Sequence, residues 1–267
     1  MPNNQQTADV TGKVALVTGG SRGVGKGIAQ ELGLLGATVY VTGRTVEQAE
    51  LGPGCLPLTC DHTHDDQVRA AIDRITAEQR RIDILVNNVW GGYEQMVESG
   101  QFTWAVPFWR QPLWRWDAMF SAGVRAHYVA SALAAAHMIE QRQGLIANIS
   151  AWAAQKHIGN VPYGVSKAAT DKLTADMAFE LREHGVAVVS VYPGMVRTEK
   201  VMEAAAYLDL SNSESPRFIG RTIAALATDP DVMSRSGSVV VAAAYARERG
   251  FSDIDGKEPR PLTLKDV

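Results

Sequence analysis

The stretch VALVTGGSRGVG, residues 14–25, decides the fold of this 267-residue chain. An apolar run leads into glycines at positions 19, 23 and 25, and a pattern of helical period then continues to Leu35. Glycines at this spacing let the backbone turn tightly and approach a pyrophosphate, while the helix N-terminus presents free N–H groups and a positive dipole. The stretch therefore predicts a strand, a phosphate-binding loop and a helix, with a simple tight turn as the alternative.

Further runs rich in Val, Ile and Leu alternate with segments of helical period. With the first strand, they give seven predicted strands at residues 14–17, 38–42, 56–60, 84–86, 145–149, 186–191 and 239–241. Continuous apolar strands separated by helices are typical of a parallel sheet covered on both faces. The sequence thus predicts an α/β fold, a three-layer αβα sandwich. Because no repeat or linker divides the chain, we expect one domain over residues 1–267.

Composition and charge exclude several classes of protein. The 26 Lys and Arg residues balance 29 Asp and Glu residues, so no broad positive field is available and we expect no nucleic-acid partner. The longest weakly polar stretch, residues 128–139, is shorter than the roughly 20 apolar residues that a bilayer crossing requires, so no membrane partner is expected. Residues 1–10 are predicted to form a flexible tail. Because they show no signal-peptide pattern, we expect a cytoplasmic location.

A dinucleotide fits the predicted glycine loop, and the end of the second strand indicates whether it is NAD(H) or NADP(H). An NAD-preferring site places Asp or Glu there, to bond the ribose 2′-hydroxyl. Residues 42–45 hold no carboxylate, whereas Arg44 and Arg22 offer two guanidinium groups that can fork onto a 2′-phosphate. We therefore expect NADP(H) to be favoured over NAD(H). The alternative is that both arginines are solvated surface charges.

Three side chains form a candidate catalytic group. Tyr163 and Lys167 lie one turn apart on a predicted helix, and Ser150 ends the fifth strand. A phenol with a pKa near 10 is a poor acid-base group at neutral pH, but a neighbouring ammonium favours phenolate and lowers that pKa. A strand-end hydroxyl can hydrogen-bond a substrate carbonyl. The Tyr-Lys spacing alone is also that of an amphipathic surface pair, so the combination with the glycine loop carries the prediction.

In their order along the chain, these landmarks resemble the short-chain dehydrogenase/reductase superfamily. The matching features are the loop at 18–25, Asp61, Asn87, Asn88, Ser150, Tyr163, Lys167 and the motif at 193–198. Residues 41–44 and 148–200 look still closer to the dehydrogenase/reductase member 1 subfamily. The resemblance implies a Rossmann-type sheet with strand order 3-2-1-4-5-6-7 and a homodimer or homotetramer.

The resemblance also implies roles for single residues. Tyr163 would protonate the carbonyl, Lys167 would lower the pKa of Tyr163 and bond the nicotinamide ribose, and Ser150 would position the substrate. The residues implied in cofactor binding are Gly19, Ser21, Arg22, Gly23, Val24, Gly25, Arg44, Asp61, Asn88, Tyr163, Lys167 and Thr198. Among them, Asp61 would meet the adenine, Asn88 the adenosine side and Thr198 the carboxamide.

One position departs from the family pattern. The family often has an Asn about seven residues after the Trp that opens the long helix, where it supports a water chain to the Lys. Counting from Trp116 reaches Gly123 instead. Because a mid-helix Gly costs about 1 kcal/mol relative to Ala, a specific reason for it is expected. Our hypothesis is a relay water held by the Gly123 carbonyl.

The substrate side is predicted from aromatic residues. Residues 91–115 form an irregular aromatic insertion, and long segments of this kind are usually binding loops. We expect Trp90, Trp152 and His157 to line a mostly apolar pocket. Each tryptophan equally suits a core or an interface, and His157 equally suits a loop surface. Residues 199–217 lie where the family carries a substrate lid.

The predicted activity is NADPH-dependent hydride transfer to a ketone or aldehyde, reversible as an alcohol dehydrogenase, on a bulky apolar or aromatic substrate. His62 and His64 resemble a metal pair, but without further ligands they are better explained as polar helix caps, so no metal is expected. Two alternatives stay open: a non-catalytic NADP(H)-binding regulatory or scaffold protein, and an NADP-dependent epimerase.

Overall fold

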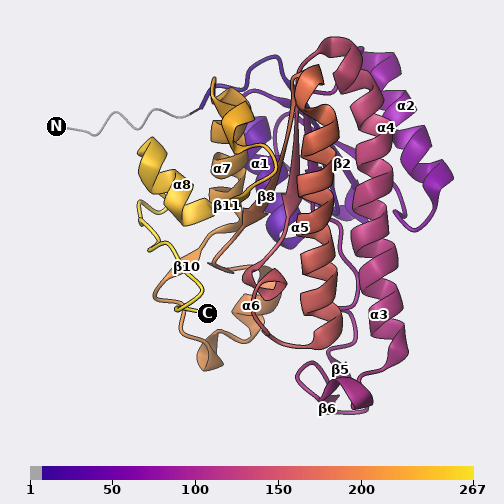
Figure 1. Ribbon diagram of the computed structural model, residues 1–267. Helices are drawn as coiled ribbons and strands as arrows, with labels where there is room; N and C mark the ends of the chain where they lie inside the picture. Colours follow the sequence, from indigo (N-terminus) through magenta and orange to yellow (C-terminus); the bar gives the residue numbers. More distant parts are fainter. Residues whose placement is uncertain (1–7) are drawn as a thin grey trace.

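A parallel sheet of seven strands forms the centre of the computed structural model, which describes residues 8–267 (Figure 1). The strands in sheet order are β3 (Cys55–Thr59), β2 (Thr38–Gly43), β1 (Val14–Thr18), β4 (Ile84–Asn87), β7 (Gly144–Ile149), β8 (Val186–Tyr192) and β11 (Val239–Val241). This order confirms the predicted 3-2-1-4-5-6-7 arrangement of the seven predicted strands.

Helices cover both faces of the sheet, which confirms the three-layer sandwich (Figure 1). One face carries α1 (Gly23–Leu34), α7 (Pro216–Thr228) and α8 (Ala242–Arg249). The other carries α2 (Asp65–Gln79), α4 (Ala126–Gln141) and α5 (Val161–Leu181). Helix α3 (Leu113–Met119) continues into α4 through a π-helical turn, Phe120–Arg125.

The remaining elements are short. They are α6 (Glu199–Glu203), the antiparallel pair β5 (Val97–Glu98) and β6 (Gln101–Phe102), the parallel pair β9 (Met195–Val196) and β10 (Ser213–Glu214), and short 3-10 turns such as Phe108–Arg110 and Trp152–Ala154. Within residues 8–267, no helix is both long and apolar enough to cross a membrane.

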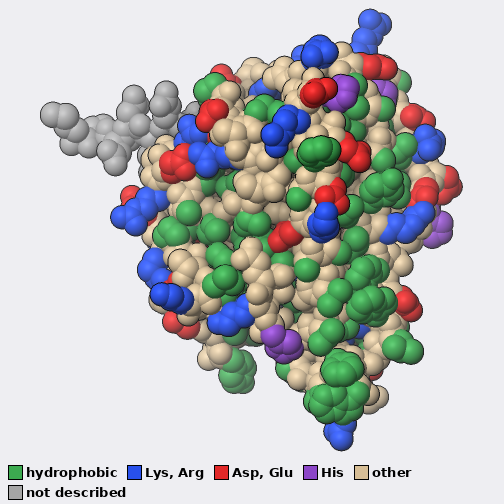
Figure 2. Space-filling model, viewed as in Figure 1, with side chains coloured by type: hydrophobic (Ala, Val, Ile, Leu, Met, Phe, Trp, Pro, Cys, Tyr) green, Lys and Arg blue, Asp and Glu red, His purple; other side chains and the backbone are tan. Residues whose placement is uncertain are grey.

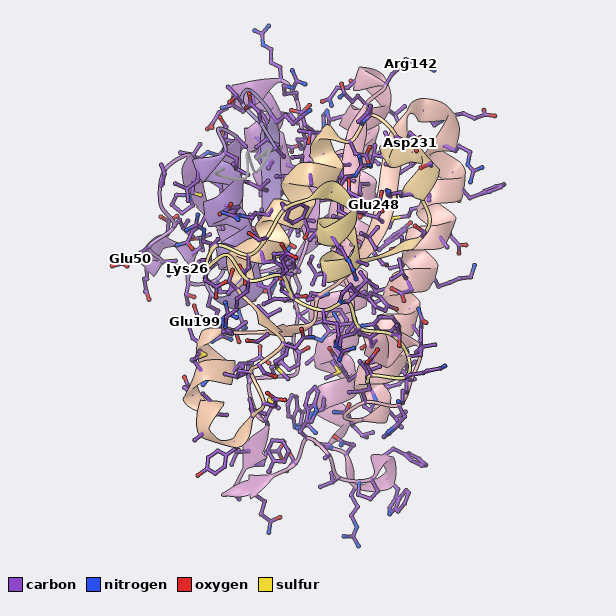
Figure 3. The ribbon with its side chains drawn as sticks, turned by 90° about the vertical axis from the view of Figure 1, so that its left-hand side faces the viewer. Lys26, Glu50, Arg142, Glu199, Asp231 and Glu248 are labelled. Carbon is purple, nitrogen blue, oxygen red and sulfur yellow. The ribbon has the colours of Figure 1, made fainter. Side chains whose placement is uncertain are left out.

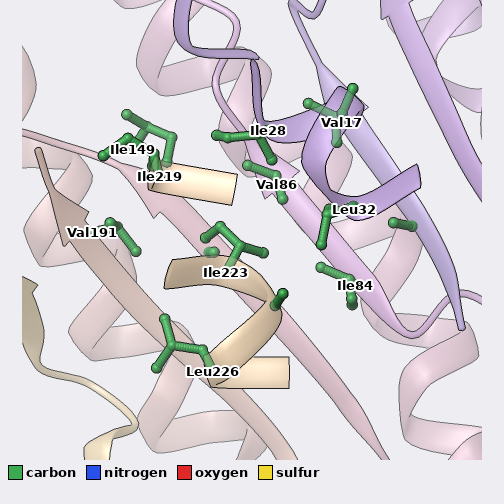
Figure 4. Close-up of a cluster of buried hydrophobic side chains, with 14 of the residues drawn as sticks. Val17, Ile28, Leu32, Ile84, Val86, Ile149, Val191, Ile219, Ile223 and Leu226 are labelled. Carbon is green, nitrogen blue, oxygen red and sulfur yellow. The ribbon is translucent and has the colours of Figure 1, made fainter. Parts of the chain in front are cut away.

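Two apolar layers form because alternate residues of each strand face opposite sides of the sheet. Toward α1 and α7, Val17 and Val86 pack with Ile28 and Ile223 (Figure 4). On the other face, Leu16 packs in a second cluster beneath α2 and α4. Burial on both faces explains why the strands carry unbroken apolar runs. Because neighbouring strands pair in parallel, their carboxyl ends lie at one edge of the sheet.

Local signals set the boundaries of the helix that carries Tyr163. The Asn160 side chain accepts a hydrogen bond from the Tyr163 N–H at 2.9 Å, and Pro162 occupies the first turn. At the other end, Gly185 adopts a positive φ of 72°, which favours glycine. Asn160 and Pro162 thus open this helix, and Gly185 ends the 3-10 turn, Arg182–His184, that follows it.

The predicted flexible tail, residues 1–10, lies outside the described residues up to position 7. Residues 8–10 correct that prediction. Val10 is fully buried in the core, and its N–H donates to the carbonyl of Leu35 at 3.3 Å. The chain is thus anchored from there because an apolar side chain docks beside the end of α1.

Candidate active site

The glycine loop joins β1 to α1 as predicted, and its glycines are required by close approach. Gly19 has φ +66°, and a Cβ built there would lie 2.6 Å from the Cα of Val89. A Cβ on Gly25 would lie 2.5 Å from the carbonyl oxygen of Gly19. Asn88, at the end of β4, donates from Nδ2 to the carbonyls of Thr18 at 3.1 Å and Gly19 at 2.9 Å. Asn88 therefore braces the loop.

The loop already binds an anionic oxygen. The N–H of Gly23 at the start of α1 donates to Oε2 of Glu199 at 2.9 Å. Figure 3 shows Glu199, from α6, below Lys26 of α1. Because a helix N-terminus favours negative charge, this carboxylate stands where phosphate oxygens of a dinucleotide would bind. The cradle thus fits the pyrophosphate of a nicotinamide cofactor.

Ser21 and Val24 complete the loop. The Ser21 hydroxyl lies beside Gly43, where a built Cβ would be 3.4 Å away, so this residue sits at the end of β2. Val24 is partly buried and packs on the core cluster. The loop therefore meets the end of the second strand, where the nucleotide ribose is expected.

Both predicted arginines are exposed. Arg22 is the N-cap residue of α1, and Arg44 follows β2 directly. Nη2 of Arg44 pairs with Oε1 of Glu94 at 3.6 Å. Burial would raise the pKa of the Asp61 carboxyl, but hydrogen bonds from Thr63 and the charge of Arg44 lower it. Arg44 thus lies near two carboxylates.

The three predicted catalytic side chains come together at the carboxyl end of β7. Lys167 is only 4% exposed, and Nζ donates to the carbonyl of Ile149 at 2.9 Å. Nζ also stands 3.4 Å from the ring centroid of Trp90 and 5.9 Å from that of Tyr163. The Ser150 hydroxyl is buried and lies 3.5 Å from the carbonyl oxygen of Lys167.

Burial shifts the acid-base properties of this group. It lowers the pKa of Lys167 to about 7, partly opposed by the nearby Asp171 carboxylate. It also raises the pKa of Tyr163, although the Tyr93 hydroxyl donates a hydrogen bond to the Tyr163 oxygen and acts in the opposite direction. Desolvation thus sets the direction for Tyr163, while Nζ of Lys167 is directed to Ile149 and Trp90. That Lys167 lowers the pKa of Tyr163 beside a bound nicotinamide stays a prediction.

Two aromatic rings from the insertion cover Tyr163. Its ring centroid lies 6.1 Å from that of Tyr93 and 5.3 Å from that of Trp104, and those two rings are 5.4 Å apart. Asn160 holds Trp104 by donating from Nδ2 to its carbonyl at 3.0 Å. The sequence predicts an aromatic insertion, but gives no signal that these two members of it contact Tyr163.

The three predicted pocket residues lie in different surroundings. Trp90 packs below Lys167 and meets His127 edge-on, with centroids 5.7 Å apart. Trp152 packs edge-on against Tyr192 at 5.2 Å. His157 is exposed on the loop before α5, as its surface alternative requires. Tyr93 and Trp104 are better placed than these residues to touch a substrate at Tyr163.

Gly123 makes room for Trp90. It lies in the π-helical turn, where a built Cβ would be 2.9 Å from both Cε3 and Cζ3 of the indole. Its carbonyl accepts a hydrogen bond from the N–H of Ala126. The structure therefore gives a reason for glycine that differs from the predicted relay: the indole ring needs the space to reach Lys167.

Arg115 holds the insertion in place. Its side chain is fully buried and donates to the carbonyls of Gln95 and Thr103, each at 3.0 Å. Between Gln95 and Thr103, the hairpin β5–β6 projects at the lower end of the molecule, where hydrophobic side chains gather (Figure 1; Figure 2). Phe102 and Trp109 are among the exposed ones.

The predicted lid, residues 199–217, is anchored at its two ends. Thr198 caps α6, its hydroxyl accepting from the N–H of Val201 at 3.4 Å. Strand β10 pairs with β9, and α7 begins at Pro216. Only residues 199–212 are thus left between these fixed points.

His62 and His64 have separate partners. Nε2 of His62 bonds the Thr42 hydroxyl at 2.8 Å, and burial lowers the pKa of His62 to about 4. His64 is exposed and bonds the Thr63 hydroxyl at 3.1 Å. No group of three or more potential His, Cys, Asp or Glu metal ligands occurs in the described part of the chain.

The fold and the glycine loop define a dinucleotide-binding protein of the Rossmann type. The family model for short chain dehydrogenases matches residues 13–208, and the chain belongs to this family of nicotinamide-dependent dehydrogenases and reductases. It is 40% identical to dehydrogenase/reductase SDR family member 1 of Mus musculus, over 94% of this chain and 86% of that protein. This identity confirms the subfamily resemblance.

Solved structures of similar proteins agree with this family assignment. A metagenomic short-chain oxidoreductase in complex with NADP is 31% identical, with a TM-score of 0.68 over 86% of this chain and 96% of that one. A 7α-hydroxysteroid dehydrogenase complexed with NADH and 7-oxo glycochenodeoxycholic acid is 25% identical, with a TM-score of 0.72 over 88% and 94%. Both nicotinamide dinucleotides thus occur among the relatives.

Proposed function

We propose that the chain is an NADPH-dependent carbonyl reductase, reversible as an alcohol dehydrogenase. The observation that carries the proposal is the grouping of Tyr163, Lys167 and Ser150 at the sheet edge where the glycine loop also lies. Because a phenol, an ammonium and a hydroxyl can together handle one carbonyl oxygen, the group suits proton transfer beside a bound nicotinamide.

The residues of the chain suggest how the proton moves. A bound nicotinamide would supply the hydride. Tyr163 would donate its proton to the carbonyl oxygen, since its raised pKa keeps the phenol protonated at neutral pH. Ser150 would donate a second hydrogen bond to that oxygen. Lys167, with a pKa of about 7, can gain a proton near neutrality and then stabilise the negative charge left on Tyr163.

Arg44 and Arg22 support NADPH as the preferred cofactor. Both side chains are exposed, Arg44 directly follows β2, and residues 42–45 hold no carboxylate. A guanidinium group binds phosphate through paired N–H donors, whereas a ribose hydroxyl gains little from it. The glycine loop with Asn88, Asp61 and Thr198 would hold the rest of the dinucleotide.

A bulky apolar or aromatic substrate fits the wall around Tyr163. Tyr93 and Trp104 present ring faces and edges there, and such rings favour flat or large apolar groups. The relative complexed with a 7-oxo bile acid supports this size class. The segment 199–212 would close over the bound molecule.

The test is NADPH oxidation with a panel of ketones, aldehydes and quinones, with Tyr163→Phe as the matched control. We expect turnover with bulky carbonyls, at least a hundredfold loss of turnover in the variant, and NADPH binding that the variant retains. Binding without turnover would instead indicate a scaffold or regulatory protein. Product formed without net NADPH oxidation would indicate an epimerase.

A homodimer or homotetramer in the cytoplasm also remains our proposal. Helices α4 and α5 carry exposed apolar side chains, among them Tyr128, Val165 and Phe179. Burying them between copies would remove apolar surface from water. Sedimentation analysis should give two or four chains, and Phe179→Asp should shift the distribution toward single chains.

A further inference from the structure

Two adjacent residues of the insertion contact both ends of the proposed site. Glu94 pairs with Arg44, the residue proposed to bind the 2′-phosphate, at 3.6 Å. Tyr93 packs edge-on against Tyr163, the proposed proton donor, with ring centroids 6.1 Å apart. One short segment thus joins the nucleotide end of the site to its chemical end.

The base of this segment is held firmly. A Cβ on Gly91 would lie 2.7 Å from the carbonyl oxygen of Ala118, and Gly92 has a positive φ of 91°. Oε2 of Glu94 accepts a hydrogen bond from the N–H of Gly92 at 2.8 Å, which leaves Oε1 directed to Arg44. We call residues 91–94 the strap. Tyr93 and Glu94 are adjacent on this short segment, so a displacement of one residue moves the other.

We propose that Glu94 is a selectivity-determining residue that links the 2′-phosphate site to Tyr163 through Tyr93. This inference rests on the proposed NADPH preference. A 2′-phosphate would compete with the Glu94 carboxylate for Arg44 and would repel it, since both are anions. NADH carries no 2′-phosphate and leaves the pair intact. NADPH would therefore separate Glu94 from Arg44 and loosen the strap. Tyr93 could then move away from Tyr163, which would expose the Tyr163 hydroxyl to the substrate carbonyl.

The ion pair is well suited to be displaced. The side chains of Arg44 and Glu94 are 66% and 39% exposed, so water and salt screen their attraction. A phosphate dianion offers more charge and paired acceptor oxygens to the same guanidinium group. The contrast is Glu199, whose carboxylate lies at the N–H of Gly23 and would compete with the pyrophosphate common to both cofactors.

The first experiment measures dissociation constants of NADPH and NADH at low salt for the whole protein. Glu94→Gln should tighten NADPH about two- to fivefold and leave NADH unchanged, the range expected for an exposed pair. Glu199→Gln should tighten both cofactors alike. Exposed Glu47, three residues after Arg44, gives the charge-matched control Glu47→Gln, which should change neither. Equal effects of Glu94→Gln on both cofactors, or none, would overturn the assignment.

The second experiment tests the link to Tyr163 with half-ligands that lack nicotinamide. Amide hydrogen exchange of residues 91–104 is followed with 2′,5′-ADP and with 5′-ADP. Faster exchange is expected with 2′,5′-ADP alone, and Glu94→Gln should exchange fast without any ligand. If 2′,5′-ADP binds no tighter than 5′-ADP, the NADPH preference itself fails. If it binds tighter but exchange in the strap is unchanged, the preference stands and the link is refuted.

Discussion

Gly123→Ala tests whether the unusual glycine exists for the sake of Trp90. The new methyl group would lie 2.9 Å from Cε3 and Cζ3 and 3.1 Å from Cη2 of the indole. The ring cannot give way easily, because Lys167 lies 3.4 Å above it and His127 packs at its edge. The variant must therefore move either the ring or the helix.

Two opposing effects set the size of the change in stability. Alanine is favoured over glycine by about 1 kcal/mol within a helix, whereas overpacking a filled site costs about 1–3 kcal/mol. The expected net result is destabilisation of about 1 kcal/mol, or roughly 2–4 °C in melting temperature for a chain of this size. The indole also fixes Nζ of Lys167 beside Tyr163. If the contact of about 1–2 kcal/mol is needed in full to hold Lys167 in the transition state, kcat should fall about five- to thirtyfold.

The assay combines thermal unfolding with kcat, and Trp90→Phe provides the second arm of a double-mutant cycle. Phenylalanine is smaller, so Gly123→Ala should cost less stability in that background, with a coupling of at least about 0.5 kcal/mol. If Gly123→Ala stabilises the protein and leaves kcat and its pH profile unchanged, then room for the indole is not the reason for glycine.

Three further changes have defined outcomes. Burial raises the pKa of Glu214 to about 7, so the free energy of unfolding of the wild type should fall as pH rises from about 4.5 through 7. Glu214→Gln should remove this pH dependence and raise the free energy of unfolding in urea at pH 8 by at most about 3 kcal/mol. Arg115→Met should leave its backbone partners unpaired, costing about 2–4 kcal/mol by urea unfolding, and raise KM for the carbonyl while NADPH binding stays unchanged. Burial lowers the pKa of Lys167 to about 7, so this residue destabilises the folded state increasingly as pH falls from about 10.5 toward 7. Lys167→Met should lose activity at least a hundredfold yet unfold at a higher temperature at pH 7. A lower melting temperature of the variant at that pH would contradict the lowered pKa.

The sequence predicts the fold well because its signals are local. Apolar runs at residues 14–17 and 145–149 form strands buried on both faces, and the glycines at 19 and 25 are required by contacts with the ends of neighbouring segments. The spacing of Tyr163 and Lys167 on one helix also follows from helical geometry alone.

The rest of the site depends on contacts between segments that share no periodic relation. Gly123 is needed by an indole 33 positions earlier, and Glu94 reaches Arg44 across the sheet edge. Burial raises the pKa of Tyr163, and that burial depends on how Tyr93 and Trp104 cover the phenol ring. Pattern and spacing carry no signal for such packing.

The most direct measurement uses NADPH labelled with deuterium at both C4 positions and mass spectrometry of the alcohol formed from an active carbonyl. The proposed reaction places one deuterium on the carbinol carbon, at a rate that Tyr163→Phe lowers at least a hundredfold. An alcohol that carries no deuterium at that carbon, or a Tyr163→Phe variant as fast as the parent, would contradict hydride transfer assisted by this phenol.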